Sequence, residues 1–309
     1  MSLPNDAHAL AKGELFPEAL IPEFFNKVKG HSSLAKMSGA SPIPFNGLRE
    51  FTFSMDNDVA IVAEAAAKSA GGAQAGTVTI IPIKIEYGAR VSDEFLYASE
   101  EVRADILRTF ADGWAKKVAR GIDIMAMHGV NPRTGTASDV IGTNNFDSAI
   151  TNVVEYLASS TTADQNIEAA TAAVIANEYD VTGVIVGNTV RAALSALTTT
   201  GGAKAYPELT WGAKPDVLNG LKFDVNGTVE ANSANARAYV GDFATAFKWG
   251  IAKQLPLEVI RYGNPDNDST AGDLAGHNQV YIRGEAYVGW GILDADAFAV
   301  VAVDDDDDI

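Results

Sequence analysis

The chain of 309 residues contains no cysteine. This absence excludes disulfide bonds, thiolate metal sites and cysteine nucleophiles. Histidine is also scarce, and His8, His31, His128 and His277 are scattered without the spacing typical of metal ligands. No apolar run approaches the ~18 residues that a membrane-spanning helix needs. The first residues lack the basic start and apolar stretch of a secretory signal. We therefore predict no metal site, no membrane span and no signal peptide.

Basic residues are few relative to acidic ones. The 23 lysines and arginines against 40 aspartates and glutamates give a formal net charge of −17 and a pI of about 4.5. Such a surface repels nucleic-acid phosphates and anionic membranes, so neither is predicted as a specific ligand. The run Asp304–Asp308 supplies five of the acids. We interpret this run as a solvated tail rather than a cation site.

Motifs that support catalysis are absent as well. The chain has no G-x-G-x-x-G or G-x-x-x-x-G-K loop for a nucleotide and no G-x-S-x-G nucleophile turn. The acidic stretch 266–271 lacks the glycine that a calcium-binding EF-hand loop requires at its sixth position. We therefore predict no catalytic residues, no metal ligands and no cofactor.

The N-terminal segment, residues 1–48, does not resemble a core element. Its prolines block helix formation for their neighbours and remove backbone donors. The aromatic residues Phe16, Phe24 and Phe25 offer apolar anchors along it. Two interpretations stay open on composition alone: an arm that lies along a neighbouring subunit, or an extension that packs on its own domain. The five prolines are Pro4, Pro17, Pro22, Pro42 and Pro44.

A long hairpin is predicted next. Residues 50–56 alternate between apolar and polar side chains, which is typical of a half-buried strand. Residues 63–76 carry mostly small side chains and cannot hold themselves against a core. Residues 77–87 read as a returning strand whose apolar phase slips by one residue, so we expect a bulge or bend at 80–82. An isolated hairpin is marginal in water, which favours contacts with a neighbouring molecule.

One long helix is predicted after the hairpin. Ser92 and Ser99 each precede acidic residues and look like helix N-caps. Gly129 is a natural C-terminal stop. The apolar series that recurs every four residues, Val102, Ile106, Phe110, Trp114, Val118 and Ile122, predicts the packed face.

The rest of the chain predicts mixed helix and strand. We expect a helix over 165–178, a buried strand over 183–187 and a helix over 189–197 capped by Asn188. Residues 221–229 predict a hairpin that turns at Asn226-Gly227. Residues 279–289 alternate for long enough to form a long strand.

The order of these parts resembles the major capsid proteins of tailed bacteriophages, which have the Hong Kong-type capsid fold. The likeness covers most of the chain, and its individual motifs gain weight from their order and spacing. The stretches that carry it are 15–18 with 32–34, 91–96 before the long helix, the turn 129–135 after it, and the late motifs 239–243 and 294–298.

The resemblance implies an α+β fold with five parts. These are an N-arm in residues 1–48, an extended E-loop hairpin in 49–91, a peripheral domain with a long spine helix in 92–135, an axial domain in 136–250, and a return to the peripheral domain with an acidic tail in 251–309. It also implies contacts between subunits through the E-loop tip and the N-arm. The residues concerned are Glu64, Lys68, Gly71 and Gly72 at the tip and Phe16, Phe24 and Phe25 in the arm.

The implied function is structural and not enzymatic. The resemblance implies self-assembly as hexamers and pentamers into an icosahedral virion shell around double-stranded DNA. The shell would assemble in the bacterial host cytoplasm and would enclose the DNA without sequence-specific binding. Because the arm begins soon after Met1, we expect a separate scaffolding protein, with a portal and optionally a cement protein as further partners. Lys68 is the only lysine near the tip, but non-covalent contacts are expected rather than a cross-link. The alternatives are an encapsulin-like compartment around cargo enzymes and, from another class, an acidic soluble α/β enzyme.

Overall fold

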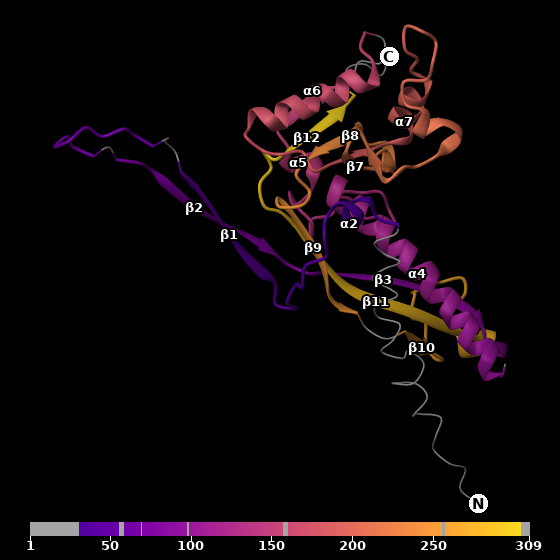
Figure 1. The fold of residues 1–309 in the computed structure, drawn as a ribbon. Coiled ribbons are helices and arrows are strands. Elements are labelled where there is room, and N and C mark those ends of the chain that lie inside the picture. The colour runs from indigo at the N-terminus through magenta and orange to yellow at the C-terminus, as the bar shows by residue number, and fades with distance from the viewer. Residues whose placement is uncertain are drawn as a thin grey trace, which may run out of the picture.

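A computed structural model describes residues 31–55, 59–68, 70–97, 99–156, 160–254 and 257–303. Two packed units and a projecting hairpin make up this part of the chain (Figure 1). One unit is built on a six-stranded sheet, and the other is built on a four-stranded sheet and the long helix α4 (Glu100–His128). The hairpin leaves the side of the molecule where the two units meet.

The hairpin consists of β1 (Leu48–Met55) and β2 (Ala73–Ile80), paired antiparallel from Leu48↔Ile80 to Met55↔Ala73. The expected break in the returning strand is confirmed, because pairing stops after Ile80 and β3 (Ile83–Ser92) begins beyond Pro82. The break is larger than a bulge: β2 pairs with β1, whereas β3 joins the four-stranded sheet. Two residues thus separate the hairpin from the body of the subunit.

The four-stranded sheet is organised around the 14-residue strand β11 (Gln279–Ile292). One edge of β11 pairs antiparallel with β3, and the other pairs with β10 (Glu258–Ile260) and β9 (Phe247–Gln254). The predicted long strand over 279–289 is therefore confirmed and is three residues longer. The loop between β10 and β11 contains the short 3₁₀ helix η4 (Ala275–His277).

The long helix α4 covers this sheet, and the short helix α3 (Glu94–Tyr97) precedes it. Both predicted ends are confirmed, since Ser99 is the N-cap and Gly129 the left-handed C-cap, with φ +66°. The predicted apolar face is only partly correct. Trp114, Val118 and Ile122 are buried, but Val102 is 48% exposed and Ile106 38%. Near this end the packed face instead includes Leu107, which is buried in a cluster with Leu257, Val280 and Ile282.

The six-stranded sheet has the order β4-β12-β8-β5-β7-β6. Helices α6 (Ala163–Ala176) and α7 (Asn188–Ala196) pack against it. Connecting pieces are α2 (Ser33–Met37), α5 (Phe146–Ala149), and the 3₁₀ helices η2 (Pro207–Gly212) and η3 (Ala231–Ser233). The strands are β4 (Asn152–Glu155), β5 (Gly183–Val186), β6 (Val217–Leu218), β7 (Leu221–Val225), β8 (Ala236–Gly241) and β12 (Phe298–Ala302).

Two local predictions in this unit are wrong. The hairpin turns at Asn219-Gly220, not at Asn226-Gly227, because β6 precedes β7 and both turn residues have positive φ. The second Asn-Gly pair instead follows β7, which runs parallel to β5. Asn188 is the first residue of α7 rather than its cap, and Gly187 holds the cap position. The backbone N–H of Thr189 is satisfied by the Glu230 carboxylate at 3.0 Å.

The domain boundaries drawn from the sequence stay a prediction, but the sheets do not follow them strictly. Strand β9 begins before residue 250 and pairs with β11 in the four-stranded sheet. Strand β12 lies after residue 251 and is an inner strand of the six-stranded sheet, between β4 and β8. The chain therefore passes between the two units several times, and a shared aromatic cluster with Phe146, Phe243 and Phe298 packs near the crossing, with ring centroids 5.0–6.1 Å apart.

Candidate assembly interface

The hairpin exposes apolar side chains that contact no core of their own subunit. Phe51 and Phe53, on one face of β1, are 80% and 63% exposed. Val59 and Ile61, towards the tip, are fully exposed. Single exposed apolar residues are ordinary, but a projecting element that carries several of them marks an interaction surface. These apolar side chains can therefore become buried only by contact with another molecule.

The predicted tip residues Glu64, Lys68, Gly71 and Gly72 all lie exposed on this hairpin. Among the described residues neither the Glu64 nor the Lys68 side chain forms an ion pair or a side-chain hydrogen bond. The four residues therefore lie together on one projecting element, and their contact with a neighbouring subunit stays a prediction. The arm residues Phe16, Phe24 and Phe25 lie outside the described residues, as does the run Asp304–Asp308.

The base of the hairpin is anchored firmly. Ile80 is fully buried, and a Cβ added at Gly291 of β11 would lie only 2.7 Å from its Cγ1 atom. Glycine at position 291 therefore permits the close approach of β2 to β11. The Lys248 ammonium of β9 adds an ion pair with the Glu50 carboxylate of β1 at 2.7 Å. The projecting part thus begins from a fixed root.

A buried carboxylate joins three segments of the chain. Asp123 of α4 is fully buried, and its Oδ1 accepts hydrogen bonds from Ser32 Oγ at 2.5 Å and the Leu34 backbone N–H at 3.2 Å. Its Oδ2 accepts from the Ser33 backbone N–H at 2.9 Å. Two further donors, Asn226 Nδ2 at 3.1 Å and Thr228 Oγ1 at 3.2 Å, come from the turn after β7. Asp123 therefore ties α2, where the described N-terminal chain begins, to both units.

Neighbouring polar contacts support the same junction. Lys36 of α2 forms ion pairs with Asp216 at 2.6 Å and Asp224 at 2.8 Å. His128, the last residue of α4, contacts Asp147 Oδ2 through Nδ1 at 2.7 Å and the Thr228 carbonyl oxygen through Nε2 at 2.8 Å. The turn at Thr228 is thus held by two residues of α4, which fixes the six-stranded unit relative to the long helix.

Burial raises the pKa of Asp123 from its ordinary value of 3.8 to about 6, although the hydrogen bonds from Ser32, Ser33, Leu34 and Thr228 oppose the shift. Since the folded pKa lies above the unfolded one, protonation favours the fold. This contribution is complete below pH 4 and is lost as the pH rises through 6, with a total on the order of 3 kcal/mol.

We therefore expect the stability of the native chain, relative to an Asp123→Asn variant, to fall as the pH rises from about 4 to about 6.5. The asparagine side chain does not titrate, so the difference isolates the carboxyl group. The measurement is the free energy of unfolding of both proteins across this pH range, followed by tryptophan fluorescence. Parallel curves for the two proteins would show that Asp123 does not titrate there.

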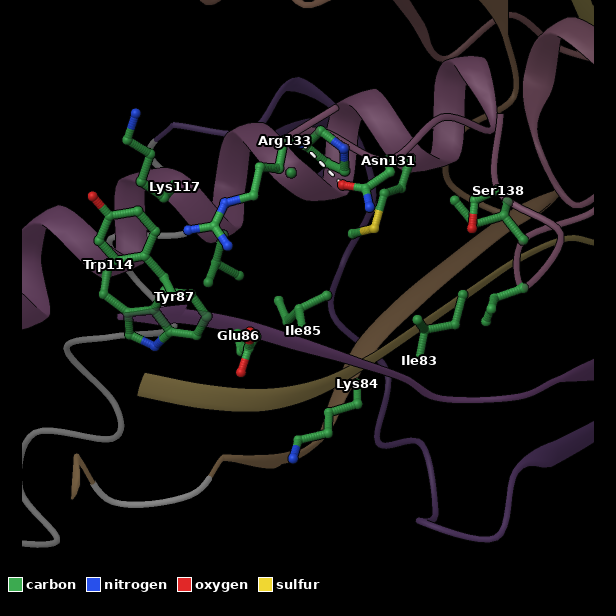
Figure 2. A pocket seen from close by; sticks show the side chains of 16 residues that line it. Ile83, Lys84, Ile85, Glu86, Tyr87, Trp114, Lys117, Asn131, Arg133 and Ser138 are labelled. Atoms are coloured by element: carbon green, nitrogen blue, oxygen red, sulfur yellow. Dashed lines mark hydrogen bonds between the residues drawn. The ribbon is translucent and has the colours of Figure 1, made fainter. Parts of the chain in front are cut away.

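A groove of about 660 Å³ lies between β3 and α4 (Figure 2). Its walls include Ile83, Ile85 and Tyr87 of β3, Trp114 of α4, and Val140 of the loop that follows α4. Lys117 and Arg133 stand at the same groove (Figure 2). The groove is mainly apolar, and its charged lining residues are Lys84, Glu86, Lys117 and Arg133. The sequence analysis did not predict it.

The described residues also bear on metal binding, on membrane spans and on the order of an acidic loop. They contain no group of three or more acidic, histidine or cysteine side chains placed to hold a metal ion. No helix among them is long and apolar enough to cross a membrane. The loop after β10 is held by Arg90, whose guanidinium contacts Asp266 through two nitrogens and lowers the pKa of that carboxyl to about 2. This acidic loop is therefore organised by an arginine.

The sequence analysis also missed Asp123. One signal was present: Asp123 is the only charged residue between Gly121 and Met127. A lone carboxylate in such an apolar stretch must be paired or hydrogen-bonded if the stretch is buried. Its donors come from residues 32–34 and 226–228, which are far away in the sequence, so no local pattern could identify them.

Comparison with known proteins gives consistent findings. A family model described as the phage capsid family matches residues 12–303. A chain from Mycobacterium phage Ogopogo is 34% identical with a TM-score of 0.75, over 89% of this chain and 92% of that chain. A chain from Gordonia phage Cozz is 22% identical with a TM-score of 0.72, over 89% and 87%. A structure titled as the capsid of an empty GTA particle is 18% identical with a TM-score of 0.59, over 88% of this chain and 90% of that chain. At these identities, the likenesses to the Gordonia phage chain and to the GTA capsid show the fold alone. No curated protein matches the chain.

Proposed function

The chain belongs to the phage capsid family and is a structural major capsid protein that self-assembles into the virion shell, and from this premise we propose how its surfaces build that shell. Subunits form hexamers and pentamers, and these close into an icosahedral container for double-stranded DNA. The observation that carries the proposal is the hairpin β1–β2, whose exposed apolar side chains have no partner in their own subunit.

In this proposal the hairpin is the E-loop, α4 is the spine helix, and the tip residues Glu64, Lys68, Gly71 and Gly72 contact a neighbouring subunit. The arm residues Phe16, Phe24 and Phe25 supply a second contact. The six-stranded unit is the axial domain, with its loops near the centre of each ring. Trp211 in η2 supports this placement, because it is fully exposed and has a left-handed backbone at φ +58°. Bulky residues rarely adopt that conformation without a function.

A separate scaffolding protein and a portal complete the assembly, which takes place in the host cytoplasm. No catalytic activity is part of the proposal. The acidic surface suits a container, because a net charge of −17 limits binding to the packaged phosphates. The family match and the capsid structures favour this function over an encapsulin-like compartment and over an acidic α/β enzyme.

Expression of the chain, alone and together with a scaffolding protein, tests the proposal. We expect shells, tubes, or rings of six and five subunits, because the hairpin surface is satisfied only between copies. The measurement is particle mass by light scattering, with negative-stain electron microscopy of the same sample. A monomer of 32.5 kDa under both conditions would contradict the proposed function.

A further inference from the structure

Strand β3 has an unpaired edge in the described part of the chain. One side of β3 pairs with β11 over the whole range from Ile83↔Val288 to Ser92↔Gln279, and no described strand pairs with its other side. Alternate residues therefore direct backbone N–H and C=O groups outward, ready to accept a further strand. Proteins usually cover such an edge, because an open one pairs with other chains.

The groove follows this open edge. Five consecutive residues of β3, from Ile83 to Tyr87, line it. Figure 2 shows Ile83 and Ile85 on the side of the strand that faces α4 and Lys84 on the opposite side. A hollow confined to one face of the sheet would be lined chiefly by the side chains of alternate residues. The groove is therefore a channel along the edge of β3, with the apolar surface of α4 and the following loop as its roof.

The charge at the groove restricts its occupant. Within the described residues neither Lys117 nor Arg133 forms an ion pair, although the chain as a whole is strongly acidic. The backbone edge requires an extended segment, and the apolar wall requires an apolar anchor. The two cations require carboxylates beside that anchor.

The segment Glu14-Leu15-Phe16-Pro17-Glu18 of this chain meets all three requirements. In a strand Glu14, Phe16 and Glu18 share one face, so an inserted Phe16 is flanked by two carboxylates. Pro17 favours an extended Phe16 and lacks a backbone donor. In the register where Glu14, Phe16 and Glu18 pair with β3, position 17 faces the new outer edge, where a donor is not needed.

We propose that this N-terminal segment of a second copy adds to the free edge of β3, with Phe16 in the groove and Glu14 and Glu18 beside Lys117 and Arg133. The inference rests on the proposed function, because the shell supplies the second copy. The length of the chain permits it: from Glu18 to His31 an extended chain spans roughly 40 Å. The hairpin tip is a weaker occupant, because Glu64 is its only carboxylate between residues 59 and 76.

Cysteine cross-linking tests this inference directly, because the native chain has no cysteine and each engineered pair is unique. The variants are Glu14→Cys with Arg133→Cys and Glu18→Cys with Arg133→Cys, in the full chain. We expect oxidation of assembled particles to remove most of the monomer band and to give multimers on a non-reducing gel. Glu18→Cys with Val217→Cys is the matched control, since Val217 is exposed on the six-stranded unit. It should stay monomeric on the gel.

Three results would overturn the inference. Cross-links within one chain would place the segment in its own groove. Cross-links from Gly71→Cys to Arg133→Cys, without any from positions 14 and 18, would assign the groove to the hairpin tip. No cross-links in well-formed shells would leave the segment elsewhere. Electron microscopy of the same particles separates these results from failure of the proposed function, in which no shells form.

Discussion

Replacing residues 56–72 with Asn-Gly should leave a folded subunit that does not form shells. The opposed residues Met55 and Ala73 end the described ladder, so a two-residue turn can close it. The change removes the exposed Val59 and Ile61 together with the predicted tip contacts. Burial of two such side chains is worth about 3 kcal/mol or more. Each contact between subunits should therefore weaken at least about 100-fold. Particle yield by light scattering and electron microscopy measures the effect.

The unfolding transition of the same variant is the internal control. The hairpin is anchored at Ile80 and by Glu50, both of which remain, so the melting temperature of the subunit should hardly change. Lys68→Ala serves as a matched single substitution, because it alters one exposed tip residue and leaves the apolar surface intact. It should still give shells. Normal shells from the shortened hairpin would show that assembly depends on other surfaces.

Replacing Asp123 with alanine should destabilise the subunit by about 3–5 kcal/mol, because five donors, four of them in buried hydrogen bonds, lose their shared acceptor. The melting temperature should fall by about 6–15 °C. Two of the donors are backbone N–H groups at the start of α2, so the variant should also release that helix. Unfolding of the unassembled subunit, followed by the fluorescence of the buried Trp249 and Trp290, measures the loss.

Asp105→Ala is the matched control for this substitution. Asp105 lies on the same helix but is exposed, so its loss should change the stability by less than about 0.5 kcal/mol. The two variants lose the same number of atoms from the same kind of side chain. Equal melting temperatures for both would mean that the network around Asp123 contributes little to the fold.

Local patterns predicted the elements whose signals lie within one segment. The caps of α4 at Ser99 and Gly129, the length of β11 and the break near Pro82 all depend on neighbouring residues. The turn after β7 shows the limit of such patterns. Two Asn-Gly pairs lie seven residues apart, and only the pairing of β7 with β5 and β6 decides which of them forms the hairpin.

The candidate interface was predicted in part for the same reason. The exposed tip followed from the small side chains of residues 63–76, which is a property of composition. The junction at Asp123 requires segments separated by about a hundred residues to meet. The groove beside β3 likewise joins separate elements, β3, α4 and the loop after α4, so both features depend on tertiary packing. The exposed Val102 and Ile106 illustrate the same limit, because an apolar stripe does not show which of its residues the rest of the subunit covers.

Strands β2 and β3 are separated by two residues, so the projecting hairpin can change its angle to the body of the subunit about the buried Ile80. An eight-residue strand spans about 26 Å, so a rotation of about 10° about Ile80 displaces the far end of β1 by about 5 Å. Because Ile80 and Glu50 are held, such a rotation changes torsion angles in the part of the hairpin beyond them and leaves the pairing of β3 with β11 intact. One sequence can thus meet its neighbours at several inclinations across a curved lattice while its interior stays the same.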